Sequence, residues 1–201
     1  MLVPIARQLG SRVFDLEYRG FENLPDEGPL LVAANHFSHV DPVFVSACAG
    51  RSIRYLSVDE LFGRSRFFDT LTGFFGAIPL PRERPPLGAM RIALEALADG
   101  ETVGLYPEGK RVASWGDVTP PNRGAAWLAF ASGAPLVPIA LVGSDATLGV
   151  LEQPLQRVSV RATAGPQLFW YDYVGFEDPL GAMMADWEAW MTSVLAPWYP
   201  S

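Results

Sequence analysis

The stretch that decides the fold is residues 29–42, which read PLLVAANHFSHVDP. Its first six residues form a short apolar run that stops at a polar loop, a pattern typical of a strand buried on both faces. At the other end, Asp41 is a good N-cap and Pro42 suits the first helical position. These two residues predict a helix that runs to about Ala49. The stretch as a whole therefore predicts a buried strand, a polar loop and a helix in succession.

The same succession of apolar runs and amphipathic stretches continues along the rest of the chain. Further strands are predicted at 12–20 (half-buried), 53–58, 77–80, 102–106, 136–142, 158–164 and 167–173, with the last two forming a pair. Further helices are predicted at 2–9, 59–75 (one or two helices), 86–98, 123–132 and 179–195. Strands separated by helices predict an α/β fold with a largely parallel or mixed central sheet flanked by helices. No repeat or linker divides the sequence, so residues 1–201 are predicted to form a single domain.

The composition is that of a folded domain with a full core. The chain has 201 residues, of which 49% are hydrophobic and 18% charged. No apolar run approaches the ~18 uncharged residues of a membrane-spanning helix, and the beginning of the sequence lacks the features of a signal peptide. The single cysteine, Cys48, excludes an internal disulfide framework and a zinc ribbon. We therefore expect a cytoplasmic protein, with the cytoplasmic face of the membrane as a second location. The excess of arginine over lysine is typical of a GC-rich bacterial genome.

The formal net charge of -7 argues against nucleic acid as a partner. The acidity is uneven, because residues 51–91 carry seven arginines and four acidic residues, a net +3 that leaves -10 for the rest of the chain. This basic segment suits a small anionic ligand. It equally suits a solvated surface, and composition alone leaves both interpretations open.

Both histidines of the chain lie in the loop that follows residues 29–34. Histidine is the side chain that most readily takes up and returns a proton near neutral pH. On a regular helix His36 and Asp41 would point apart, but a loop that ends at a helix start lets the carboxylate orient the imidazole as a base. Two other interpretations stay open. Asp41 could be only a helix cap, or His36, His39 and Asp41 could be metal ligands.

A second polar loop, PEGKR at 107–111, follows the predicted strand 102–106. Proline ends the strand and glycine permits a tight turn, which leaves Glu108, Lys110 and Arg111 at the carboxyl edge of the sheet. Ligands of α/β sheets bind at that edge. Taken alone, this loop is also compatible with an ordinary charged turn.

Together, the two loops resemble the glycerolipid acyltransferase family, typified by 1-acylglycerol-3-phosphate O-acyltransferases. The N-H-x-S-x-x-D motif of that family matches residues 35–41, and its P-E-G-x-R motif matches 107–111. Two weaker blocks appear in the right order, GAIPLPR at 76–82 and VPI at 137–139. The four blocks span residues 35–139, about half of the chain.

The resemblance implies the fold of that family and a role in phospholipid biosynthesis. A fatty acyl group would pass from an acyl-CoA or acyl-carrier-protein thioester to a hydroxyl of lysophosphatidic acid or a related lysophospholipid, with no further cofactor and no metal. His36 would be the general base and Asp41 would orient it. The other residues of these blocks would contact the substrates, with Lys110 adding a cation beside the site; they are Asn35, Ser38, Arg82, Glu108, Gly109, Lys110 and Arg111.

The chain departs from the family pattern at two positions. Lys110 stands where the family usually has Thr or Ser, and Pro79 replaces an apolar residue of the second block. The cation at Lys110 suits a phosphate and also keeps a non-glycerolipid or specialised-metabolite hydroxyl open as the acceptor. A metal-dependent hydrolase that uses the two histidines and Asp41, and a non-catalytic lipid-binding module, are the alternatives from other classes.

A phenylalanine-rich segment is the best candidate for peripheral contact with a membrane. Its aromatic residues lie near Arg64 and Arg66, which suits anionic lipid, whereas the same spacing also suits a helix packed on the core. The residues concerned are Phe67, Phe68, Phe74 and Phe75.

Overall fold

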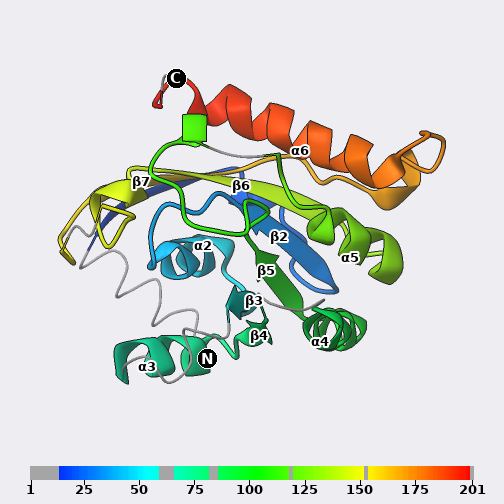
Figure 1. Ribbon diagram of the computed structural model, residues 1–201, viewed down its shortest axis with the longest axis horizontal. Coiled ribbons are helices and arrows are strands. Elements are labelled where there is room, and N and C mark those ends of the chain that lie inside the picture. Colours follow the sequence, from blue (N-terminus) through cyan, green and yellow to red (C-terminus); the bar gives the residue numbers. More distant parts are fainter. Residues whose placement is uncertain (1–13, 59–65, 82–85, 118–119, 152–153, 200–201) are drawn as a thin grey trace.

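The computed structural model describes residues 14–58, 66–81, 86–117, 120–151 and 154–199. They form a helix–sheet–helix sandwich around one seven-stranded sheet (Figure 1). Within these ranges no helix is both long enough and apolar enough to cross a membrane. The helix expected at 2–9 and the first part of the one expected at 59–75 lie outside the described residues.

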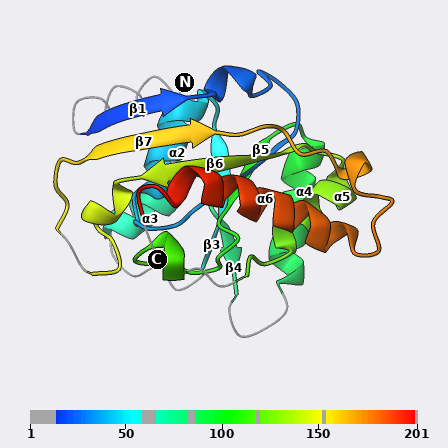
Figure 2. The ribbon, with the colours of Figure 1, turned by 90° about the horizontal axis from the view of Figure 1, so that it is seen from above.

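The central sheet is largely parallel, as predicted. Its spatial order is β1-β7-β6-β2-β5-β3-β4, and among the strand pairs of this sheet only β6 and β7 run antiparallel. The strands are β1 (Asp15–Arg19), β2 (Leu30–Ala34), β3 (Ile53–Val58), β4 (Ile78–Leu80), β5 (Thr102–Leu105), β6 (Leu136–Val142) and β7 (Ser159–Ala164). Seen from above, β1 and β7 lie side by side at one edge of the sheet (Figure 2).

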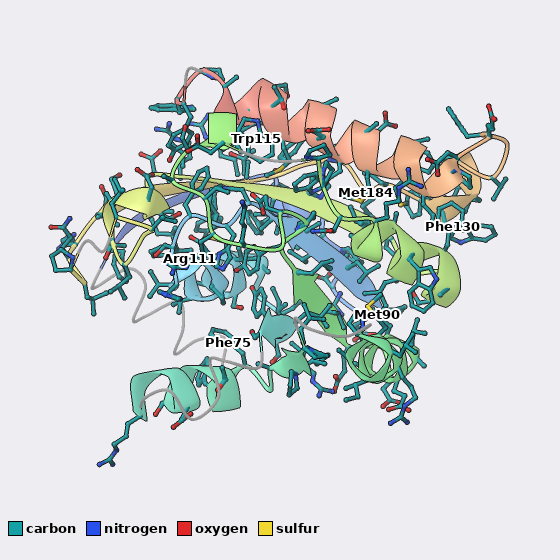
Figure 3. The ribbon with its side chains drawn as sticks, viewed as in Figure 1. Phe75, Met90, Arg111, Trp115, Phe130 and Met184 are labelled. Atoms are coloured by element: carbon teal, nitrogen blue, oxygen red, sulfur yellow. The ribbon has the colours of Figure 1, made fainter. Side chains whose placement is uncertain are left out.

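Helices cover both faces of this sheet (Figure 1). They are α2 (Asp41–Ala49), α3 (Arg66–Phe74), α4 (Leu87–Ala98), α5 (Gly124–Ser132) and α6 (Pro179–Leu195). Residues of α4, α5 and α6 build one core cluster, and residues of α2 build the other. Trp115, which lies under α6, and Met184, on α6 itself, belong to the first cluster, whereas Phe75 belongs to the second (Figure 3).

The sequence of β2 is apolar throughout because both faces of the strand pack in the core. Successive side chains of a strand point to opposite faces. Leu31 and Ala33 accordingly contribute to the cluster under α6, and Leu30 and Val32 to the cluster around Phe44 of α2. All five residues of β2 are buried, as the apolar run predicted, and the strand lies in the interior of the sheet between β6 and β5.

The structure corrects three local predictions. The N-cap of α2 is Val40, with Asp41 already inside the helix, because the Asp41 carboxylate turns back toward the preceding loop. Residues 167–173 are not a strand: only Leu168 pairs, with Leu136, and a 3-10 turn follows at Trp170–Asp172. Strand β1 is mostly exposed rather than half-buried, because it is an edge strand that pairs only with β7.

Candidate active site

Two neighbouring parallel strands bring the two polar loops together. β2 pairs with β5, so the loops that follow their carboxyl ends start side by side. Two hydrogen bonds then join the loops. The backbone N–H of His36 donates to Glu108 Oε1 at 3.1 Å, and the N–H of Val112 donates to the carbonyl of His36 at 2.9 Å. The backbone of His36 is thus held by residues more than seventy positions away.

His36 and Asp41 form a hydrogen-bonded pair. His36 Nδ1 lies 2.9 Å from Asp41 Oδ2, and the same oxygen accepts the backbone N–H groups of Phe37 at 2.8 Å and Ser38 at 2.7 Å. Asp41 is fully buried, while the His36 side chain keeps 19% of its surface exposed. Because a carboxylate oxygen can only accept, Nδ1 is the donor, and Nε2 is left as the nitrogen able to accept a proton.

An aromatic column lies against this histidine. The Tyr106 ring is parallel to the imidazole, with 4.0 Å between ring centroids and 14° between planes, and Tyr55 lies parallel behind Tyr106. Neither tyrosine is among the site residues predicted from the sequence. No local pattern pointed to them, because the column depends on the adjacency of β3 and β5 in the sheet.

Glu108 points inward rather than into the open edge of the sheet. It is only 4% exposed, and it does not line the adjacent cavity. Burial raises the pKa of its carboxyl to about 8, against the opposing effect of the hydrogen bond that Glu108 accepts from the His36 backbone. In this structure Glu108 therefore supports the histidine loop from behind.

The turn after Glu108 has a conformation that requires glycine. Gly109 has φ +71°, and a Cβ there would lie 2.8 Å from Asn122 Nδ2. Asn122 holds the turn by donating its backbone N–H and its side-chain amide to the carbonyl of Pro107, at 2.8 and 2.9 Å. Asn122, which the sequence analysis did not predict, is thus the residue that shapes the PEGKR loop.

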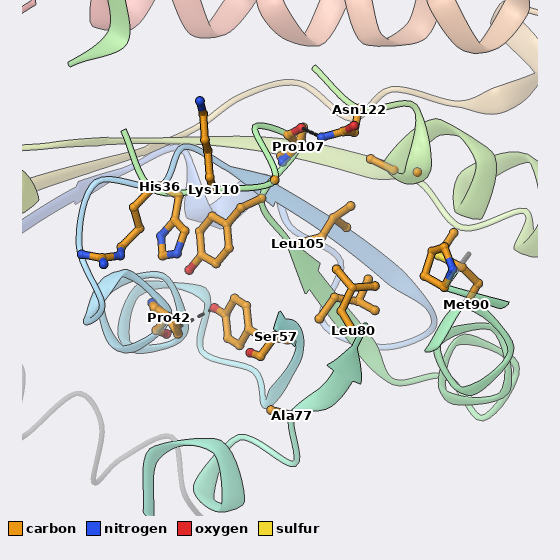
Figure 4. A pocket seen from close by; sticks show the side chains of 18 of the residues that line it. His36, Pro42, Ser57, Ala77, Leu80, Met90, Leu105, Pro107, Lys110 and Asn122 are labelled. Atoms are coloured by element: carbon orange, nitrogen blue, oxygen red, sulfur yellow. Dashed lines mark hydrogen bonds between the residues drawn. The ribbon is translucent and has the colours of Figure 1, made fainter. Parts of the chain in front are cut away.

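Next to His36 lies a cavity of about 710 Å³, in the size range of small-molecule sites (Figure 4). His36 and Lys110 stand at one end of the view, and Leu80, Leu105 and Met90 lie toward the other. Arg111 also lines the cavity, and its Nη1 donates to the carbonyl of Gly149 at 3.0 Å. The cavity can thus hold a ligand with a polar, anionic end beside His36 and an apolar remainder.

Two residues predicted to contact substrate instead brace the loop. Asn35 is fully buried; its Nδ2 donates to the carbonyl of Leu141 at 3.0 Å, and its Oδ1 accepts the N–H of Leu141 at 2.7 Å. Ser38 is also buried, and its Oγ donates to the carbonyl of Thr147. Neither lines the cavity. Both motif positions are explained by the loop conformation.

The geometry does not support the metal-site interpretation. In the part of the chain that the structure describes, no three His, Cys, Asp or Glu side chains are grouped as a metal site would need. His36 Nδ1 is directed at Asp41, whose Oδ2 already accepts two backbone amides.

Arg82, one of the predicted site residues, lies outside the described residues, and so do the side chains of Phe67 and Phe68. Phe75 is buried in the core and Phe74 is 37% exposed.

Comparison with known proteins supports the family that the two loops resemble. The model of the Acyltransferase family matches residues 15–142. A 1-acyl-sn-glycerol-3-phosphate acyltransferase of Bacillus subtilis is 32% identical over 123 residues, which are 61% of this chain and 60% of that protein. A chloroplastic 1-acyl-sn-glycerol-3-phosphate acyltransferase of Brassica napus is 28% identical over 134 residues, 65% of this chain and 38% of that protein.

The fold also matches a solved structure. The crystal structure of PlsC, the 1-acyl-sn-glycerophosphate (LPA) acyltransferase of Thermotoga maritima, superimposes with a TM-score of 0.76 at 19% identity, over 98% of this chain and 81% of that one. At this identity the match concerns the fold. The chain spans 60% or less of the length of the two curated relatives above.

Proposed function

The chain belongs to the acyltransferase family, and from its site we propose that it transfers a fatty acyl group from a thioester to the hydroxyl of lysophosphatidic acid or a related lysophospholipid. The observation that carries this proposal is the His36–Asp41 pair, 2.9 Å apart, at the edge of a cavity with a polar and an apolar end. The names of the relatives in Bacillus and Brassica supply the substrate class.

In the proposed reaction His36 is the general base. Nε2 removes the proton of the acceptor hydroxyl, and the resulting alkoxide attacks the thioester carbonyl. The C–S bond then breaks, and the imidazolium returns its proton to the leaving thiolate, so that an ester and a free thiol are formed. Asp41 holds the imidazole in the tautomer that this step needs and stabilises the transient positive charge.

The acyl donor is proposed to be an acyl-CoA or an acyl carrier protein, with no other cofactor. The apolar wall around Leu80, Leu105 and Met90 suits a fatty chain. Lys110 and Arg111 suit the phosphate of the acceptor, and Arg82 is a third candidate from the sequence. The proposed steps are proton transfers by His36 and a nucleophilic substitution at the thioester carbonyl, neither of which is assigned to a metal ion, so the reaction is expected to continue in the presence of a chelator.

The test is release of free thiol from palmitoyl-CoA and from palmitoyl-acyl carrier protein, with lysophosphatidic acid, a neutral lysophospholipid and a simple alcohol as parallel acceptors. We expect thiol release that depends on lysophosphatidic acid and that His36→Gln lowers by about 10²–10⁴-fold. The variant His39→Gln measures the separate contribution of the second histidine of the loop, which lines the same cavity but lies outside the pair with Asp41. Wild-type turnover in His36→Gln, or loss of turnover with EDTA, would contradict the proposed chemistry.

A further inference from the structure

Tyr106 covers one face of the histidine. The two rings are nearly parallel, at 14°, and their centroids are 4.0 Å apart. Tyr55 lies on the other face of Tyr106, at 5.9 Å and 11°. The three rings form one column, so the imidazole meets an aromatic ring on this side and not water.

The column is held from behind by α2. The hydroxyl of Tyr55 donates to the carbonyl of Pro42 at 3.2 Å and lies 3.2 Å from Ser46 Oγ. Gly104, which pairs with Tyr55 in the sheet register, leaves room for this ring, because a Cβ at that position would lie 2.5 Å from Tyr55 Cε1. The ring plane of Tyr106, against which the imidazole of His36 stacks, is therefore set by the packing of β3, β5 and α2.

The part of Tyr106 that contacts the histidine is its ring and not its hydroxyl. Within the described residues, the hydroxyl is buried and has no hydrogen-bond partner. Burial raises the pKa of this phenol well above its usual range, so the ring is neutral at physiological pH. An unpaired buried hydroxyl lowers stability. The contact of Tyr106 with His36 is thus made by the face of its ring.

We propose that Tyr106 is a positioning residue for His36, whose ring holds the imidazole plane and stabilises the imidazolium formed when the base takes its proton. The face of an aromatic ring attracts a cation within about 6 Å of the centroid, and more strongly where water is excluded. The neutral imidazole gains less from the same contact. The contribution to turnover rests on the proposed function, whereas the effect on the protonation of His36 does not.

Several other charged or titratable groups face the same histidine. Asp41 bonds to the ring and Glu108 to the backbone of His36; His39, Lys110 and Arg111 line the same cavity, and Tyr55 lies behind Tyr106. Each of them influences how readily the imidazole is protonated. A test must therefore leave all of them in place and change only the electrons of the ring at position 106.

Phenylalanine and its fluorinated analogues at position 106 meet this requirement. Fluorine withdraws electrons from the ring face while the ring keeps its shape, so the fold is preserved. The chain has two histidines, and His39→Gln assigns their NMR signals. We expect the pH midpoint of His36 to be the same in Tyr106→Phe as in wild type, and to fall stepwise with fluorination, by about 0.4–1.5 pH units for the pentafluoro ring.

The same series gives a kinetic readout. The kcat for thiol release should fall by about 3- to 30-fold across the series, with an unchanged KM for the acceptor, because only the protonated base loses stabilisation. The control places pentafluorophenylalanine at position 130 of α5, where Phe130 packs against Trp170. This change should affect neither the pH midpoint of His36 nor kcat. Equal thermal unfolding midpoints throughout the series would confirm that the fold is intact.

Two outcomes would overturn the inference. One is a His36 midpoint and a kcat that do not change along the fluorinated series. The other is a Tyr106→Phe variant that already loses activity, which would assign the effect to the hydroxyl. A midpoint that follows fluorination in a protein that releases no thiol with any acceptor would support the inference and reject the proposed function.

Discussion

His36 Nδ1 lies 2.9 Å from Asp41 Oδ2, although five residues separate the two and a regular helix would turn them apart. The loop brings them together because the same carboxylate oxygen also accepts the amides of Phe37 and Ser38. One buried oxygen thus orients the proposed base and fixes the backbone that carries it. Chemistry and loop conformation are therefore expected to respond differently to different substitutions of Asp41.

Asp41→Asn should mainly impair the reaction. The amide oxygen still accepts a backbone N–H, but the negative charge that supports the imidazolium is lost, so kcat should fall by about 10²–10⁴-fold. Asp41→Ala should also impair stability. It leaves the buried amides of Phe37 and Ser38 without an acceptor, at a cost of about 2–6 kcal/mol in the free energy of unfolding.

Urea unfolding and thiol release, measured for both Asp41 variants, separate the two effects. Asp99→Asn, at an exposed position after α4, serves as the control for loss of a carboxylate. An Asp41→Ala protein as stable as Asp41→Asn would show that the two amides find other acceptors.

A matched pair of glycines tests the aromatic column. Gly104→Ala places a methyl group 2.5 Å from Tyr55 Cε1 and 2.7 Å from Ile53 Cγ2, so it should lower the free energy of unfolding by about 1–3 kcal/mol. Gly88 lies in the first turn of α4, with no atom within 4 Å of an added Cβ. Gly88→Ala should therefore raise stability, by up to about 1 kcal/mol. Chemical denaturation measures both, and a neutral Gly104→Ala would mean that Tyr55 can shift without cost.

The sequence predicted those features that depend on local patterns. The apolar run before Asn35 gave β2, and Pro42 marked the beginning of α2. The meeting of His36 and Asp41 was also foreseeable, since it needs only a loop that ends at a helix start. These features lie within fourteen consecutive residues.

The features that were not predicted depend on which strands are neighbours. Asn35 is bonded to Leu141, 106 residues away, so nothing near it in the sequence showed that its amide braces β6. The burial of the Glu108 side chain and the stacking of Tyr106 on Tyr55 depend likewise on the adjacency of β2, β5 and β3 in the sheet. The stretch 167–173 was predicted to be a strand paired with 158–164, but only Leu168 pairs, with Leu136, before the 3-10 turn at Trp170–Asp172.

Substitutions of two adjacent phenylalanines allow membrane contact and core packing to be tested separately. Phe74 is 37% exposed at the end of α3, whereas Phe75 is buried and packs edge-on against Tyr55. Phe74→Ser should weaken sedimentation with anionic vesicles and leave stability almost unchanged. Phe75→Ser should lower the free energy of unfolding by about 3–5 kcal/mol, as loss of a buried aromatic ring does. Unchanged vesicle binding in Phe74→Ser would exclude this end of α3 as a membrane contact.

Arg82 tests whether the acceptor carries a phosphate. A charge-assisted guanidinium contact contributes about 1.5–3 kcal/mol, so Arg82→Ala should raise the apparent KM for a phosphorylated acceptor by roughly 10- to 150-fold. The thioester donor should be affected less. Arg82→Lys should recover only part of the loss, because an ammonium keeps the charge but not the fork. Equal kinetics for wild type and Arg82→Ala, with the acceptor below saturation, would favour a neutral hydroxyl substrate.

The buried carboxyl of Glu108 makes stability depend on pH. Its pKa rises from 4.5 to about 8, mainly because burial disfavours the charged form. Between these two values the folded protein holds a proton that the unfolded chain releases. The free energy of unfolding should therefore fall as pH rises through this window, by up to about 1.4 kcal/mol per pH unit.

Glu108→Gln removes this dependence, because the amide is neutral at every pH and its oxygen can still accept the N–H of His36. Urea unfolding from about pH 5 to pH 8 should give a steeper loss of stability for wild type than for the variant. Glu101→Gln, whose carboxylate is 46% exposed and pairs with Arg54 at the surface, should keep the wild-type slope. If wild type and Glu108→Gln lose stability in parallel, the carboxyl is already ionised in the folded protein, and the support that it gives to the His36 loop is that of an anion.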